Sequence, residues 1–308
     1  MRTQLLALCL IAMAHFTYGQ KNEVAFRLSD KELIPEGIAY DAASKTFFLG
    51  SIAKKKIVMI DANKTVSDFV PSGQDELGEV LGMKVFNGSL WACSNMPESG
   101  KAMVHQFDIA SRKLIKKWTL NIPTEKHLFN DLVVLNAKEA MVTDTDAGSL
   151  YSVDDASSDP KLFLQDVRLR YINGITTTPD NEFLMVNALT GFLKISVATK
   201  EISLLPFKGY YSMGIDGLYW YKQSLIGIQN ISFPAAVNQY SLNATFSEVL
   251  TAKVLVSNHP DWEIPTTGVI VSDWLYYIAN SQVLNYDMGA VKDPTKLKEV
   301  LVMRVSLR

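Results

Sequence analysis

Four stretches decide the fold of this chain: Pro35-Glu36-Gly37-Ile38, Asn130-Asp131-Leu132-Val133, Asn173-Gly174-Ile175-Thr176 and Asp216-Gly217-Leu218-Tyr219. In each stretch a side chain that carries an oxygen ligand opens an apolar run, after a turn-like or loop-like segment. Two more units begin at Gly82 and Gly268 and share the pattern without the ligand. The six units start 43 to 52 residues apart. A repeat of this length is typical of a β-propeller, in which a four-stranded blade recurs around a ring.

Short β runs separated by tight turns fill the units. Asn87-Gly88 predicts a hairpin, and residues 178–182 (Thr-Pro-Asp-Asn-Glu) predict a turn. A β-sandwich would not need six similar units, and a β-helix would repeat at a shorter period. We therefore predict an all-β fold, a six-bladed β-propeller with four-stranded blades and a central metal site, in which residues 21–308 form a single domain. Residues 24–28 and 300–307 are expected to share one blade and close the ring.

The first 20 residues have the features of a signal peptide. Met1-Arg2 supplies a positive start, residues 5–14 are apolar, and residues 18–20 (Tyr-Gly-Gln) turn polar near a cleavage site. The apolar run is too short to span a bilayer, which takes about 20 residues. We expect export, to the periplasm or outside the cell, without a membrane span. Cleavage would leave Cys93 alone, so no intramolecular disulfide is expected.

Composition excludes some functions. The chain has 308 residues and a formal net charge of −2, and its Lys and Arg residues form no stripe that would attract nucleic acid. We therefore expect no nucleic-acid partner. The expected partner is a small molecule, and the chain is expected to be a monomer.

The four ligand-bearing side chains predict a cation site. Strands that start at one end of a ring would aim Glu36, Asn130, Asn173 and Asp216 at a common axis. Two carboxylates and two amides form an oxygen-only set of charge −2, which suits a divalent cation such as Ca²⁺. Mg²⁺, Mn²⁺ and Zn²⁺ are alternatives, although a dedicated zinc site normally uses nitrogen or sulfur. Taken singly, each of the four is also a common turn residue.

These motifs resemble the gluconolactonase and regucalcin (senescence marker protein) family, and more distantly paraoxonase and diisopropyl fluorophosphatase. The similarity covers essentially the whole mature chain in blade order. It implies that Glu36, Asn130, Asn173 and Asp216 hold one catalytic divalent metal at the floor of the central tunnel. Sugar-lactone members commonly have an Arg where this chain has Leu128. Paraoxonases use an Asp for a second calcium where this chain has Gly37.

The predicted function is hydrolysis of a small, relatively apolar lactone or ester. A divalent cation polarises a carbonyl oxygen, and water attacks with the help of a carboxylate. Asp216 is the expected base or nucleophile, and Glu36 is the expected anchoring ligand. The alternative is a non-catalytic propeller that keeps the metal for stability and binds a ligand or a protein.

Residues just upstream of each ligand position are expected to form the substrate pocket. The candidates are Glu79, His127, Phe129, Tyr171, Met213, Trp262 and Glu263. Aromatic residues and Met are frequent among them, which fits an apolar pocket wall, but they could equally pack between blades. His127 is a candidate general base or a loop residue.

Overall fold

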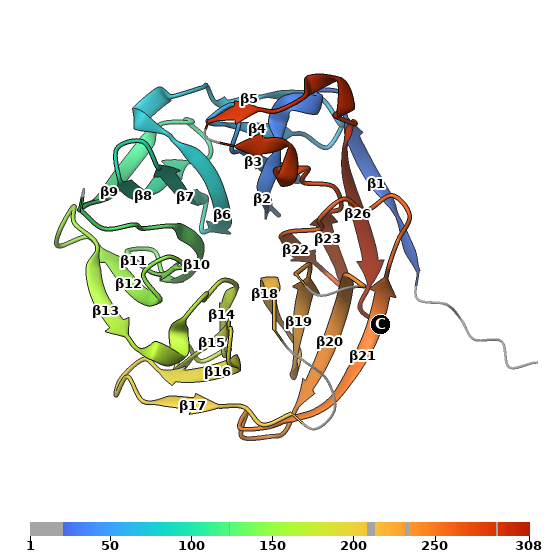
Figure 1. The fold of residues 1–308 in the computed structure, drawn as a ribbon. Helices are drawn as coiled ribbons and strands as arrows, with labels where there is room; N and C mark the ends of the chain where they lie inside the picture. Colours follow the sequence, from blue (N-terminus) through green and yellow to red (C-terminus); the bar gives the residue numbers. More distant parts are fainter. Residues whose placement is uncertain (1–20, 123, 208–212, 232–233, 288) are drawn as a thin grey trace, which may run out of the picture.

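The chain forms a closed ring of six β-sheets in this computed structural model, which describes residues 21–308 except 123, 208–212, 232–233 and 288. The predicted signal peptide lies outside the described residues. Figure 1 shows the six sheets as blades around a central axis, each with its first strand innermost. The predicted all-β, six-bladed propeller with four-stranded blades is therefore confirmed.

The first three blades follow in chain order. Blade 1 comprises β2 (Pro35–Asp41), β3 (Thr46–Ser51), β4 (Lys56–Ile60) and β5 (Val66–Val70). Blade 2 comprises β6 (Glu79–Phe86), β7 (Ser89–Met96), β8 (Lys101–Asp108) and β9 (Leu114–Asn121). Blade 3 comprises β10 (Phe129–Asn136), β11 (Glu139–Asp144), β12 (Ser149–Asp154) and β13 (Lys161–Gln165).

The remaining blades complete the ring. Blade 4 comprises β14 (Ile175–Thr177), β15 (Phe183–Ala188), β16 (Gly191–Ser196) and β17 (Ile202–Leu204). Blade 5 comprises β18 (Ile215–Tyr221), β19 (Ser224–Gln229), β20 (Ala236–Leu242) and β21 (Val249–Ser257). Blade 6 comprises β22 (Gly268–Val271), β23 (Trp274–Ile278), β26 (Val300–Ser306) and β1 (Asn22–Leu28).

The two ends of the chain close the ring in blade 6. The N-terminal strand β1 pairs antiparallel with β26, and Leu28 lies opposite Val300. The expectation that these segments share a blade is confirmed. This pairing matters because an open ring would leave two blades with uncovered apolar faces and unpaired strand edges.

Apolar clusters fill the spaces between neighbouring blades. Both faces of a blade are covered, so its strands contain long apolar runs rather than a strict alternation. Between blades 2 and 3, for example, Trp91 and Trp118 are fully buried and stack with ring centroids 5.2 Å apart. The six interfaces each bury such a cluster, and together they form the core of the ring.

Blade 6 contains an insertion between β23 and β26. It includes the short hairpin of β24 (Tyr286–Asp287) and β25 (Ala290–Val291). Tyr286 and Val291 pack with Ile34 and Ile52 of blade 1. The only helical segments in the described ranges are the 3₁₀ turns Lys31–Leu33, Gln74–Glu76, Val167–Leu169, Val283–Asn285 and Pro294–Lys296. None of them is long and apolar enough to cross a membrane.

The innermost strands approach one another closely at the axis. A Cβ atom added to Gly37 would lie 1.9 Å from the carbonyl oxygen of Leu81, and one added to Gly174 would lie 2.4 Å from that of Asp216. A glycine directly after the ligand residue therefore lets the strand backbones converge around the tunnel. The backbone of Leu81 also leaves no room at position 37 for the acidic side chain that paraoxonases have at this place.

Candidate functional site

The four predicted ligand residues lie at the same end of four innermost strands. Glu36, Asn130 and Asp216 are the second residues of β2, β10 and β18, and Asn173 comes two residues before β14. Figure 1 shows these strands converging around the axis. The register inferred from the repeats therefore places these residues at one end of the ring, around its axis.

Two of the carboxylates affect each other electrostatically. Partial removal from water and the nearby charge of Asp216 raise the pKa of Glu36 well above its usual value. Partial removal from water also raises the pKa of Asp216 to about 6; a hydrogen bond from Asn230 opposes this, and the charge of Asp131 adds to it. Both side chains are half-buried. Neither forms an ion pair with a described residue, so two like charges face each other without a counterion.

Hydrogen bonds hold both carboxylates in place. Asn230 Nδ2 donates to Asp216 Oδ2 at 2.7 Å and to the carbonyl oxygen of Pro265 at 3.0 Å. Ser281 Oγ donates to Glu36 Oε1 at 3.3 Å. The side chain of Asn173 lies close enough to Asp216 to oppose the rise in its pKa, and the charge of Asp216 acts on Glu36. Glu36, Asn173 and Asp216 therefore form one cluster.

Asn130 joins the cluster through Thr145. Asn130 Nδ2 donates to Thr145 Oγ1 at 3.0 Å, and this hydroxyl donates to the carbonyl oxygen of Ile172 at 2.6 Å. Because Ile172 directly precedes Asn173, the two predicted amide ligands are linked by one short hydrogen-bonded path. With its NH₂ group held by Thr145, the amide of Asn130 keeps its oxygen available.

One buried atom of the cluster lacks a partner. Asn173 Oδ1 is shielded from solvent and accepts no hydrogen bond in the described part of the protein. An unpaired amide oxygen beside two carboxylates that repel each other suits a hard divalent cation, which binds oxygen ligands and offsets their charge. The residues present therefore fit such an ion. Across the described ranges, no three His, Cys, Asp or Glu side chains gather as a metal site; here, amides would have to complete the shell.

Asp131 belongs to a different arrangement, further along the strands. Its carboxylate is 1% exposed and lies 2.7 Å from Lys84 Nζ. It also accepts hydrogen bonds from the backbone N–H groups of Leu132 at 2.9 Å and Ile175 at 3.4 Å. Asp131 is therefore a structural anion that the chain itself neutralises, and it ties β10 to the start of β14.

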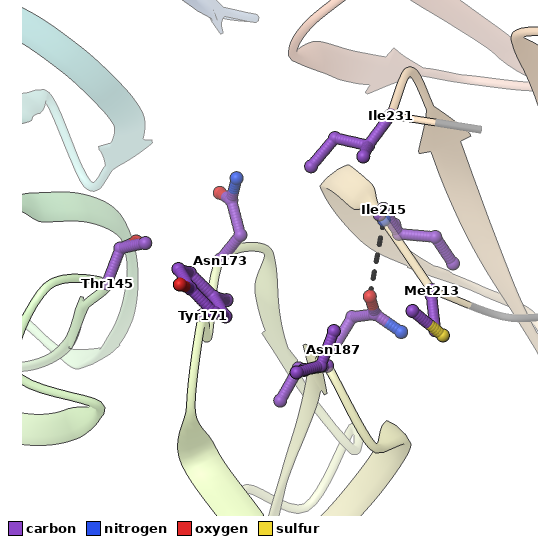
Figure 2. A pocket seen from close by; sticks show the side chains of 10 residues that line it. Thr145, Tyr171, Asn173, Asn187, Met213, Ile215 and Ile231 are labelled. Atoms are coloured by element: carbon purple, nitrogen blue, oxygen red, sulfur yellow. Dashed lines mark hydrogen bonds between the residues drawn. The ribbon is translucent and has the colours of Figure 1, made fainter.

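A cavity of about 520 Å³ adjoins the cluster between blades 4 and 5. Figure 2 shows Asn173 projecting into the space between Thr145 and Ile231. The cavity is lined by Thr145, Tyr171, Asn173, Asn187, Ala188, Leu189, Met213, Gly214, Ile215 and Ile231. Its lining is therefore mainly apolar, and Asn173 belongs to both the cavity and the oxygen cluster.

The predicted pocket residues have different surroundings. Tyr171 and Met213 line this cavity. Glu79 lines a separate cavity of about 540 Å³ under the β24–β25 hairpin, where it accepts a hydrogen bond from Tyr286 Oη at 2.7 Å. Glu263 accepts one from Asn285 Nδ2 at 3.1 Å.

Three others are engaged in packing. Phe129 is fully buried between blades 2 and 3. Trp262 packs edge-on against Tyr277 with ring centroids 5.9 Å apart. His127 Nδ1 lies 2.6 Å from Asp144 Oδ2, and the side chain of His127 is 1% exposed. The structure therefore places His127 in a buried pair with Asp144.

Several polar residues of the site were not predicted from the sequence. Thr145, Asn230 and Ser281, like Leu189 at the cavity, follow the second strand of their blades. Loops after the second strand lie at the same end of the ring as the start of the first strand, so they surround the tunnel mouth. Because all of them occupy the same position in the repeat, directly after the second strand, that position could have identified them from the sequence.

The comparisons with known proteins give the fold. No protein-family model matches the chain, and no curated protein matches its sequence. Among solved structures, a gluconolactonase from Xanthomonas campestris is 13% identical with a TM-score of 0.61, over 93% of this chain and 94% of that one. Regucalcin, a calcium-binding protein from Agrobacterium tumefaciens, is 16% identical with a TM-score of 0.60, over 92% and 96%.

A propeller of another activity is equally similar. Virginiamycin B lyase from Staphylococcus aureus is 10% identical with a TM-score of 0.62, over 94% of this chain and 100% of that one. The gluconolactonase and regucalcin structures confirm the resemblance at the level of the fold. Because the same ring also carries a lyase, the activity has to be argued from the site.

Proposed function

We propose that this protein is a divalent-cation-dependent hydrolase of a small, relatively apolar lactone or ester. The observation that carries the proposal is the cluster of Glu36, Asn173 and Asp216, in which two half-buried carboxylates have no counterion, and Asn173 Oδ1 has no hydrogen-bond partner, among the described residues. The adjoining apolar cavity offers space for a substrate. The resemblance to gluconolactonase supports the hydrolytic reading, and regucalcin, a calcium-binding neighbour, supports Ca²⁺ as the ion.

The four side chains act together in this proposal, and Asp216 has an additional role. Glu36, Asn130, Asn173 and Asp216 would hold the cation, which supplies positive charge where the carbonyl oxygen of the substrate becomes negative. Asn230 and Ser281 orient the two carboxylates through the hydrogen bonds described above. Asp216 accepts a proton from the attacking water. The water oxygen bonds to the carbonyl carbon, the ester C–O bond breaks, and the proton passes to the departing alkoxide.

A non-catalytic binding module is the second candidate. The burial of His127 favours it, because this candidate base is paired with Asp144 and its side chain is only 1% exposed, which limits its access to a substrate. In that case the cation would stabilise the ring, and the cavity would bind a ligand without turnover.

The test uses residues 21–308 with lactones, aryl esters, glucono-lactone and phosphotriesters. We expect hydrolysis of an apolar lactone or aryl ester that chelator abolishes and Ca²⁺ restores. Glu36→Gln and Asp216→Asn should each lower kcat/KM on the order of a hundredfold or more, with weaker Ca²⁺ binding by calorimetry. Asp159→Asn, at an exposed loop position of blade 3, serves as the control and should change neither.

Two results would decide against the proposal. If wild-type protein with Ca²⁺ bound hydrolyses none of the substrates, the binding module is the better account. If hydrolysis persists in chelator and in both variants, the cation has no part in the reaction.

We also propose that the chain is exported after removal of residues 1–20. N-terminal sequencing of the protein recovered from the producing cells would show a start near Lys21. A start at Met1 would exclude it.

A further inference from the structure

We infer that the cavity between blades 4 and 5 binds a hydrocarbon tail, so that the substrate is a lactone or ester carrying an alkyl chain. This inference rests on the proposed hydrolysis at the oxygen cluster and names the substrate class for it. The tail would lie between the two blades while the carbonyl group lies at Asn173, the residue shared by cavity and cluster.

The first argument is the chemistry of the cavity wall. None of the described residues that line it carries a charge. The apolar side chains of Leu189, Met213, Ile215 and Ile231 line it, and Figure 2 labels Met213, Ile215 and Ile231. Burying an alkyl chain against such a wall is favourable by about 0.8 kcal/mol for each methylene, or about fourfold in affinity.

The second argument is the exposure of the rim. Tyr171, Leu189 and Ile231 are 61%, 43% and 74% exposed, although all three are large and apolar. Three such side chains around one cavity form an apolar rim, and a patch of this kind at a pocket commonly marks a binding site. Tyr171 also has a φ of +55°. A bulky residue in the left-handed region is strained, and strain of this kind is concentrated at functional sites.

The third argument concerns the polar atoms of the cavity. Thr145 Oγ1 already donates to Ile172 and accepts from Asn130. Asn187 Oδ1 accepts from the backbone N–H of Ile215 at 3.2 Å. The hydroxyl groups of a sugar lactone would lose water on entry and find few free partners in the described lining, which is unfavourable for each group left unsatisfied. The cavity therefore favours an alkyl tail over a polyol.

Substrate series and cavity variants test the inference. The probes are γ-lactones whose alkyl substituent grows by one methylene at a time, with glucono-lactone as the polyol. We expect kcat/KM to rise about fourfold per methylene while the tail stays inside the cavity. Leu189→Ser and Ile231→Ser should each lower kcat/KM for the longest tail about tenfold, and for the shortest tail less than about twofold. Leu250→Ser, at a residue of β21 that is 55% exposed, is the matched control and should leave the series unchanged.

A binding measurement separates this inference from the proposed function. The probes are 2-alkylcyclopentanones, which cannot be hydrolysed, titrated by calorimetry. Binding that tightens with tail length and weakens in Leu189→Ser supports the cavity assignment even if no lactone is hydrolysed, in which case only the proposed function fails. Hydrolysis that does not depend on tail length, or that is faster with glucono-lactone, overturns the inference and leaves the hydrolase standing. Ketones that do not bind in proportion to their tails also overturn it.

Discussion

Two sets of carboxylates lie on the innermost strands in different electrostatic surroundings: Asp131, and the pair of Glu36 and Asp216. Asp131 is 1% exposed and is paired with Lys84 at 2.7 Å, so its charge is neutralised within the chain. Glu36 and Asp216 are half-buried at the tunnel mouth and face each other without a counterion among the described residues. A buried charge is tolerated when it is paired and hydrogen-bonded, and it is costly otherwise. The pair of Asp131 and Lys84 therefore has a structural role, whereas Glu36 and Asp216 are arranged to receive positive charge from outside.

The surroundings of Asp131 and Gly37 limit how many cations could bind near the axis of the ring. The ammonium group of Lys84 lies against Asp131 and 5.5 Å from the centre of the Tyr219 ring. Gly37 provides no carboxylate, and a side chain there would collide with Leu81. Among the described residues, Asp131 therefore has an internal cation whereas Glu36 and Asp216 do not, and we expect the following changes to affect the two groups differently.

The largest expected effect comes from breaking the paired group. Lys84→Met leaves Asp131 buried without a partner, and the loss of one partner of a buried pair costs about 4 kcal/mol. Chemical denaturation would measure this as a lower free energy of unfolding. The control is Lys56→Met, which breaks the surface pair with Asp68 at 2.8 Å and should cost less than about 1 kcal/mol. Equal losses in the two variants would contradict the structural role of Lys84.

The stability of protein kept free of metal by chelator should depend on pH through Asp216, one of the two unpaired carboxylates. The pKa of Asp216 is about 6 in the folded state and 3.8 in the unfolded chain. Its folded pKa is raised, so its contribution to stability is present below pH 3.8 and lost as the pH rises through 6. We expect a loss of about 2 kcal/mol, less than the full two-unit shift implies because the mouth is open to water.

The matched measurement uses Asp216→Asn, which cannot ionise at this position. Urea denaturation of both proteins between pH 4 and 7 should show wild-type stability falling relative to the variant. Comparison with the variant is needed because His105, whose pKa burial lowers to about 4, changes stability in the opposite direction as the pH rises. If the free energy of unfolding changes with pH in the same way in both proteins, ionisation of Asp216 does not destabilise the folded state.

The smallest expected effect concerns the support of the unpaired group. Asn230→Ala removes the hydrogen bond to Asp216 Oδ2, and the loss of a partner that orients a metal ligand typically lowers affinity roughly tenfold. Calorimetry with Ca²⁺ would show the weaker binding. Asn243→Ala, in the loop between β20 and β21 of the same blade, is the control and should bind Ca²⁺ as the wild type does. Unchanged affinity in Asn230→Ala would show that Asp216 needs no orienting partner.

Much of the fold followed from the repeats in the sequence. Each unit brings its own strands and turns, so the number of blades and the pairing of β1 with β26 could be predicted from segments a few residues long. The position of Glu36, Asn130, Asn173 and Asp216 in the repeat could also be predicted, because equivalent residues of equivalent strands lie at the same height around the axis.

Other features of the site depend on contacts between blades. Asn230 and Thr145 hydrogen-bond to carbonyl groups just before the next blade, those of Pro265 and Ile172. Lys84 of blade 2 meets Asp131 of the neighbouring blade 3, 47 positions away in the chain. Phe129 and His127 are close to the ligand register, yet their side chains point into the packing between blades. The sequence alone determined a ring of six units with four oxygen-bearing side chains at one register. The tertiary structure decided which carboxylate has an internal cation and which side chains line the cavity, because side-chain directions and charge pairs between neighbouring blades exist only once the blades have packed together.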